Sequence, residues 1–161
     1  MKELESYLND HLAGSVGALE LLARWAQLYK DKPLGAFFTQ LKAEIQADQA
    51  TLRDLMRVLG VEESKVRRVG AWAVEKVGRA RFMIAGDETD SLGLVLALEG
   101  LVMGIVGKKL LWRALAAANL SKVGAFDFKE LERRAEQQFE RTEAERIRAA
   151  RRAIGSTTGL D

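Results

Sequence analysis

Residues 92–106, LGLVLALEGLVMGIV, are the stretch of sequence that decides the fold class. Apolar side chains occur around nearly the whole circumference that a helix here would have, and Glu99 is the one charge among them. The run is shorter than the roughly 20 apolar residues of a membrane-spanning helix, and Glu99 lies near its middle. A helix that is apolar on all sides is typically buried in a protein core. We therefore expect a helical bundle in which this segment is the most buried element, and no membrane span.

The flanking sequence repeats apolar side chains at the three-and-four spacing of one helix face, as at Leu4, Leu8 and Leu12. Pro33 suits the first turn of a helix, and Gly60 suits the left-handed position that ends one. Ser64 and Asp127 are candidate caps at helix starts. The sequence thus predicts helices at about 3–30, 34–59, 64–85, 91–117 and 127–154, followed by a frayed tail at 155–161.

The predicted helix at 64–85 connects two helical pairs. Its apolar positions again follow helical spacing: Val66, Val69, Trp72, Ala73, Val77, Ala80, Met83 and Ile84. No alternating run of β-branched residues indicates a strand. We therefore predict an all-α, four-helix bundle of two antiparallel hairpins joined by a helical crossover, with residues 1–154 forming a single domain.

Composition excludes several functional classes. The chain has 161 residues, no cysteine and one histidine, which removes thiolate chemistry and every metal motif with two histidines. A formal net charge of +2, with alternating signs along the chain, gives no indication of nucleic-acid binding. Lys2, Glu3 and Glu5 follow Met1 where a secretory signal would need an apolar core, so we expect a cytoplasmic location.

The predicted pairs of helices, the crossover and the carboxylate within Leu98-Glu99-Gly100-Leu101 resemble the ferritin-like superfamily, particularly its small bacterial stress-associated members. The resemblance covers most of residues 3–154. It implies a site for two iron or manganese ions, held by one glutamate on each of two helices and a Glu-x-x-His pair on each of the other two.

Two side chains can bind the same metal ion only if they lie at the same level along the paired helices, so we compared residues at equal distances from each turn. Ser15 or Val16 should lie opposite Asp48, and Glu99 should lie opposite Thr142 and Glu143. The family motif then falls on Asp48-Gln-Ala-Thr51 or Glu44-Ile-Gln-Ala47, and on Glu143-Ala-Glu-Arg146, none of which contains histidine. The candidate metal ligands are therefore Glu44, Asp48, Glu99 and Glu143, with His11 as a further donor.

Each candidate also has a structural interpretation. Glu99 is expected to be buried, and a buried carboxylate needs a partner, either a metal ion or one of Arg146, Lys108 and Lys109. His11 lies near an apolar stripe, where a lone imidazole is more often a hydrogen-bonded boundary residue than a catalytic base. Glu44 and Asp48 share one helix face and could share a cation.

Three functional hypotheses follow. The first is a ferritin-like bundle without an intact di-metal site and without a cofactor, which has a structural or protein-interaction role. Its expected partner is a second copy of the chain, in a homodimer, or an unidentified protein. The alternative is a di-iron or di-manganese oxidase or peroxide-consuming enzyme with a carboxylate-rich site. The third is a bundle whose core holds an apolar ligand.

Overall fold

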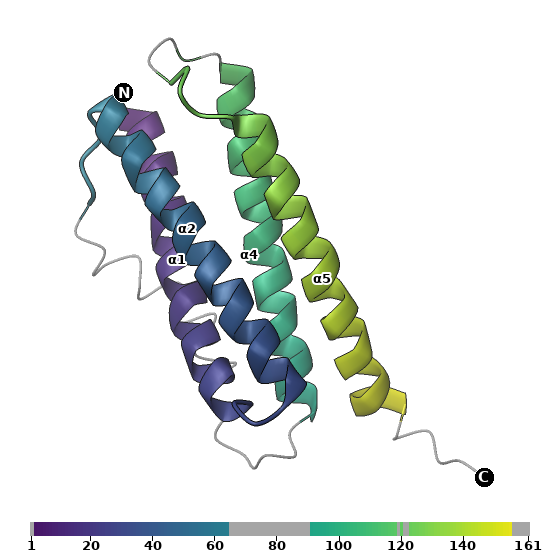
Figure 1. Ribbon diagram of the computed structural model, residues 1–161. Coiled ribbons are helices and arrows are strands. Elements are labelled where there is room, and N and C mark those ends of the chain that lie inside the picture. The colour runs from purple at the N-terminus through teal and green to yellow at the C-terminus, as the bar shows by residue number, and fades with distance from the viewer. Residues whose placement is uncertain (1, 65–90, 119, 121–122, 156–161) are drawn as a thin grey trace.

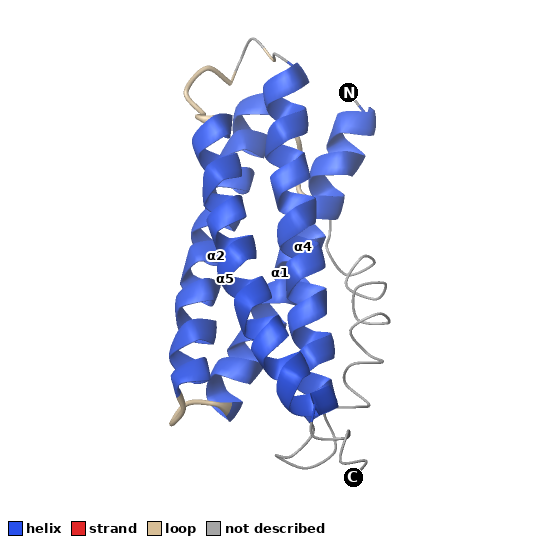
Figure 2. Cartoon of the chain, turned by 90° about the vertical axis from the view of Figure 1, so that its right-hand side faces the viewer, coloured by secondary structure: helices blue, strands red, loops and turns tan. Residues whose placement is uncertain are grey.

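The computed structural model describes residues 2–64, 91–118, 120 and 123–155. These residues form α1 (Lys2–Leu28), α2 (Pro33–Leu59), α4 (Ser91–Ala118) and α5 (Phe128–Gly155), and they contain no strand (Figures 1 and 2). The prediction of an all-α bundle is confirmed at this level, with helix bounds within two residues of the expected ones. The predicted helix at 64–85 lies outside the described residues apart from Ser64, as does the predicted tail beyond Gly155. No described helix combines the length and apolarity needed to cross a membrane.

The turn between α1 and α2 is held by backbone contacts. Pro33 opens α2, where its missing N–H costs no hydrogen bond. The Lys32 N–H donates to the Tyr29 carbonyl over 2.9 Å, and the Gly35 N–H donates to the Lys32 carbonyl over 2.9 Å. A Cβ on Gly35 would lie 2.1 Å from the Tyr29 carbonyl oxygen. Only glycine fits this tight connection without displacing the backbone.

Two further helix ends follow the predicted signals. Gly60 adopts a left-handed conformation with φ of 69° after the end of α2, and its N–H donates to the Arg57 carbonyl. Asp127 caps α5, because its Oδ1 accepts the Glu130 N–H over 3.0 Å. Both caps are confirmed.

The helices form two antiparallel hairpins. α1 packs against α2, α4 packs most extensively against α5, and contacts between α1 and α4 join the two hairpins. The α1–α2 turn and the start of α4 lie at one end of the bundle, while the end of α2 and the α4–α5 connection lie at the other (Figure 1). The end of α2 at Leu59 and the start of α4 at Ser91 therefore lie at opposite ends of the bundle.

Two apolar clusters form the core. One, toward the α1–α2 turn, comprises buried residues Leu21, Leu22, Trp25, Phe38, Leu41, Ile45, Leu94, Val95, Ala97, Leu98, Leu101, Ile105 and Ala149. The other, toward the opposite end, comprises Leu8, Leu12, Leu52, Leu55, Met56, Val61, Leu111, Trp112, Leu115, Val123, Leu131 and Ala135. The two clusters leave the middle of the bundle to other side chains.

α4 contributes buried residues to both apolar clusters, as expected of a buried helix, but one of its sides is exposed. Leu98 and Ile105 are buried, but Leu92, Met103 and Leu110 expose 48%, 67% and 50% of their surface. α4 packs against α5 on one side and α1 on another, and the described residues leave a third side of the helix uncovered. Apolar composition alone therefore did not indicate which side of this helix faces the core.

Candidate functional site

A layer of polar side chains separates the two apolar clusters, and all four described helices contribute to it. The members of this polar layer are Ser15 of α1, Asp48 and Gln49 of α2, Lys108 of α4 and Gln138 of α5. Gln49 Nε2 donates a hydrogen bond of 2.8 Å to Ser15 Oγ. This contact places Ser15 at the height of Asp48 to within one residue, as the sequence predicted.

Asp48 is the most buried charge of the polar layer, at 3% exposed. Its Oδ2 accepts hydrogen bonds from Lys108 Nζ at 2.5 Å and from Gln138 Nε2 at 3.1 Å. Its Oδ1 lies 2.8 Å from Arg134 Nη2, an ion pair whose angles are not those of a hydrogen bond. Both carboxylate oxygens therefore face a cation of the protein, which offsets the cost of removing the charge from water.

Lys108 reaches the same carboxylate from α4. Its Nζ also donates to Gln138 Oε1, so the ammonium is shared between a charged and a neutral acceptor. Burial lowers the pKa of the Lys108 ammonium below its ordinary value, and Arg134 lowers it further, while Asp48 opposes both effects. The ammonium is held in the bundle interior by Asp48 and Gln138 against the cost of its own desolvation.

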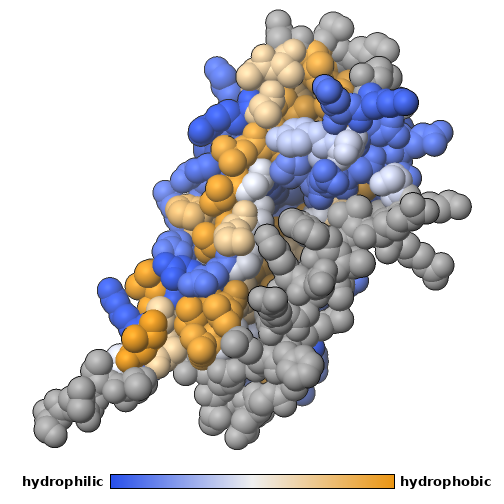
Figure 3. Space-filling model, turned by 180° about the vertical axis from the view of Figure 1, so that it is seen from behind, coloured by the Kyte–Doolittle hydropathy of each residue, from blue (hydrophilic) through white to orange (hydrophobic). Residues whose placement is uncertain are grey.

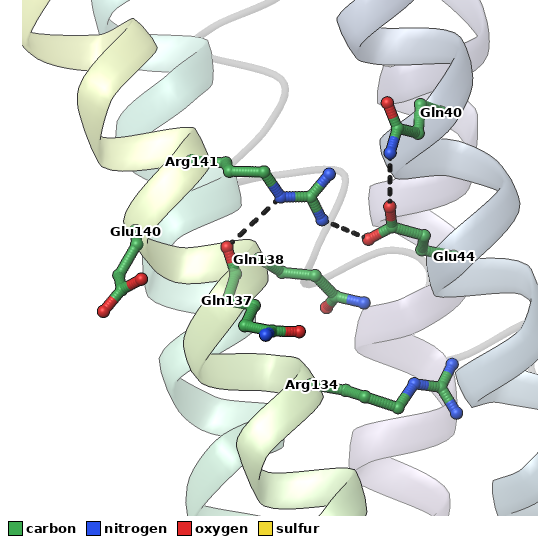
Figure 4. A pocket seen from close by; sticks show the side chains of 7 residues that line it. All are labelled: Gln40, Glu44, Arg134, Gln137, Gln138, Glu140 and Arg141. Carbon is green, nitrogen blue, oxygen red and sulfur yellow. Dashed lines mark hydrogen bonds and ion pairs between the residues drawn. The ribbon is translucent and has the colours of Figure 1, made fainter.

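Glu44 lies one turn from Asp48, beside a groove between α2 and α5 of about 470 Å³ (Figure 4). Arg141 donates to Glu44 Oε2, and Gln40 Nε2 donates to Oε1 over 3.1 Å. Burial alone would raise the pKa of the Glu44 carboxyl, but the hydrogen bond and charge of Arg141 outweigh it and leave the pKa below its ordinary value. Glu44 is thus already paired with Arg141, which favours the ionised carboxylate.

The side chains that line this groove are all polar or charged. They are Gln40, Glu44, Arg134, Gln137, Gln138, Glu140 and Arg141. Two arginines and two glutamates leave the lining without net formal charge. The groove does not have the apolar lining that a site for an apolar ligand would need.

Glu99 does not join this layer. Its side chain is 45% exposed, so the expected burial is wrong, and its Oε1 lies 3.4 Å from Arg146 Nη1. Arg146 Nε also lies 2.6 Å from Glu143 Oε2, so one guanidinium serves both carboxylates. The ion pair with Arg146 is confirmed, and it lies about one turn beyond the height expected from Thr142 and Glu143.

The two lysines considered as partners of Glu99 pair elsewhere. Lys108 pairs with Asp48, and Lys109 Nζ lies 2.6 Å from Glu136 Oε2. For Lys108 the reason is helix geometry, because Glu99 and Lys108 are separated by about 2.5 turns and so project from opposite sides of α4. Once Lys108 faces the interior, Glu99 must face outward.

His11 lies apart from both the polar layer and Glu99, on α1 near α4. Its ring stands edge-on to Tyr7, with centroids 4.7 Å apart, and its Cε1 is 4.0 Å from where a Cβ on Gly107 would be. Burial lowers the pKa of the imidazole below its ordinary value of 6.5, and Asp10 only partly offsets the effect. Burial therefore shifts the imidazole toward its neutral form.

The candidate ligands thus fall in three separate places: Glu44 with Asp48, Glu99 with Glu143, and His11. Within the described ranges, no three histidine or acidic side chains are grouped so that they could hold a metal ion. Sequence reasoning missed Gln49 and Gln138 as interior residues and Arg134 as a partner of Asp48. Gln138 and Thr142 share the buried face of α5 with Leu131 and Ala135, and this interruption of an apolar stripe was the available signal.

Comparisons with protein-family models, with curated proteins and with solved structures give no match for this chain. The fold and the polar layer alone therefore define the class of protein. It is an all-α bundle of two antiparallel hairpins with the polar layer at mid-height.

Proposed function

We propose that the chain is a ferritin-like four-helix bundle that has no di-metal centre and serves a structural or protein-interaction role. The observation that carries this proposal is the ion-paired state of Asp48, whose two oxygens face Lys108 and Arg134. In this interpretation, the protein's own cations take the place of a metal ion as partners of the interior carboxylate.

The donor set does not fit a di-metal centre. A dication needs several oxygen or nitrogen donors that converge with free lone pairs. Here a metal ion at Asp48 would have to displace the Lys108 ammonium at 2.5 Å and the Arg134 guanidinium at 2.8 Å. Either cation, if it stayed in place, would repel the metal ion. Glu44, the nearest acidic neighbour along α2, is paired with Arg141. No oxidase or peroxide chemistry is therefore assigned to these residues.

An interaction role is supported by large apolar side chains at the surface, including Leu92, Met103 and Leu110. A second copy of the chain or another protein could use such a surface, and a cytoplasmic location is part of the proposal. Light scattering after size-exclusion chromatography measures whether a homodimer forms.

Elemental analysis tests the absence of a metal centre. The protein would be expressed in medium supplemented with iron and manganese, alongside Asp48→Asn and the surface control Asp54→Asn. We expect all three to contain far less than one metal ion per chain. One or two ions per chain in the parent and Asp54→Asn, lost in Asp48→Asn, would overturn the proposal. Peroxide consumption by the parent that disappears in Glu99→Gln would equally overturn the proposal and support the alternative of a di-metal peroxide-consuming enzyme.

A further inference from the structure

The groove between α2 and α5 lies where these two helices are bridged by long side chains and are not packed directly against each other. The backbones of α1 and α2 lie close together, as do those of α4 and α5, whereas those of α2 and α5 scarcely approach one another. Arg141 crosses this space to Glu44 (Figure 4), and Arg134 crosses it to Asp48. The two arginines are about two helix turns, or about 10 Å, apart along α5. Two guanidinium groups of one helix therefore point into a single polar space.

The groove has the size and the lining of a site for a small charged molecule. Its volume of about 470 Å³ is within the range of known small-molecule sites. Its lining is polar or charged, in contrast to the band of apolar side chains on the face seen from behind in Figure 3. Such a lining favours a ligand that exchanges its hydration for charge-assisted hydrogen bonds.

The charged groups between the helices leave one cation in excess. Two carboxylates and three cations meet across α2, α4 and α5, namely Glu44, Asp48, Lys108, Arg134 and Arg141. Glu140 also lines the groove, but its exposed side chain projects to the side of α5 away from Glu44 (Figure 4). Lys108 and Arg134 share the charge of Asp48, and the repulsion of Arg134 contributes to the lowered pKa of Lys108. An anion beside Arg134 would balance the excess charge.

Arg134 also has unused hydrogen-bond donors. Its Nη2 lies 2.8 Å from Asp48 Oδ1 without the angles of a hydrogen bond, and no described residue accepts a hydrogen bond from its guanidinium. A guanidinium has five N–H donors and can hold a carboxylate or phosphate through two of them at once. Since 34% of the Arg134 side chain is exposed and the residue lines the groove, these donors are accessible to a molecule there.

We propose that this groove binds a small molecule through a carboxylate or phosphate group, with Arg134 as the main contact and Arg141 as the second. The ion pair with Asp48 holds Arg134 in place before the ligand arrives, which lowers the cost of ordering it. Glu44 already occupies part of Arg141 and competes with the ligand for it. The site needs no metal ion and is independent of the structural or interaction role proposed above.

Titration of the full chain with inorganic phosphate, and separately with succinate, tests the site. Backbone amide NMR signals report binding, and sodium chloride is adjusted to hold the ionic strength constant, so that general screening is the same at every point. We expect at least one of the two anions to cause saturable shifts at residues that line the groove. Saturation by only one anion would support the site and identify the oxyanion that it prefers. No saturable shift with either anion up to about 20 mM would overturn the proposal.

Two neighbouring arginines provide a matched pair of variants. Arg134→Gln should weaken binding of the effective anion about tenfold, because it removes the charged donor. Arg133→Gln is the control, because Arg133 is paired with Glu130 and does not line the groove, and its dissociation constant should stay within about twofold of the parent's. Equal weakening by the two substitutions would show a general attraction of anions to α5 and would overturn the site.

A third variant predicts a gain of affinity. Glu44→Gln removes the carboxylate that competes for Arg141 and should tighten binding about fivefold. This variant keeps the contact of Arg134 with Asp48, so it tests the site even if Arg134→Gln does not fold. Circular dichroism checks the helix content of each variant. Unchanged or weaker binding by folded Glu44→Gln would place the anion outside the groove and overturn the proposal.

Discussion

Asp48 Oδ2 on α2 lies 2.5 Å from Lys108 Nζ on α4, and this ion pair connects the two hairpins through the middle of the bundle. The pair is buried on the Asp48 side and nearly so on the Lys108 side. Removing one partner of a buried ion pair costs more stability than removing one partner of a surface pair, because the remaining charge is left unpaired in a medium of low polarity.

Asp48→Asn should therefore lower the free energy of unfolding by about 3 kcal/mol, because Lys108 and Arg134 lose their shared anion. Urea denaturation measures the change. The matched control is Asp54→Asn, which removes an exposed ion pair with Arg57 and should change stability by no more than about 0.5 kcal/mol. Equal effects of the two substitutions would contradict the buried pairing of Asp48.

Replacement of the interior polar group as a whole should behave differently. The triple variant Asp48→Leu, Lys108→Met and Gln138→Leu removes charge and hydrogen-bonding groups together, and Arg134, with 34% of its side chain exposed, can turn toward water. Apolar replacements of buried ion pairs are often neutral or stabilising. We expect the triple variant to be more stable than Asp48→Asn in the same urea titration. A lower stability than the single variant would show that packing, and not charge, is the main contribution here.

The single histidine gives a pH-dependent prediction. Burial holds the pKa of His11 below 6.5 in the folded chain, so the unfolded chain binds a proton more readily as pH falls through that value. The unfolding free energy of the parent should therefore decrease relative to that of His11→Gln between pH 7.5 and 5, and the two should run parallel above pH 7.5. Carboxylates titrate in both proteins and cancel in the difference. An unchanging difference over this range would contradict a desolvated imidazole.

Gly35→Ala should destabilise the first hairpin by about 2 kcal/mol, because the added Cβ would lie 2.1 Å from the Tyr29 carbonyl oxygen and the backbone of the turn would have to move. Gly14→Ala is the control within α1, since a Cβ there meets nothing within 4 Å. It should stabilise the protein by up to about 1 kcal/mol through helix propensity. Thermal unfolding followed by circular dichroism compares the two, and similar shifts would be inconsistent with the close approach at Gly35.

Several features of the fold were accessible from sequence because they depend on short-range chemistry. The missing N–H of Pro33, the left-handed tolerance of Gly60 and the side-chain acceptor of Asp127 each act within one helix turn, and the structure places helix ends at all three. The relative height of Ser15 and Asp48 also followed, because residue rise is fixed and the position of the turn was known.

The tertiary structure alone decided which charges meet. α4 is so uniformly apolar that its sequence does not specify its rotation about its own axis, and that rotation placed Lys108 inside against Asp48 and Glu99 outside against Arg146. The long side chains of Arg134 and Arg141 then determined how the acidic residues of α2 are neutralised, over distances that no local pattern encodes. Helix formation and helix ends are properties of neighbouring residues, whereas the pairing of charges depends on how rigid helices turn toward one another.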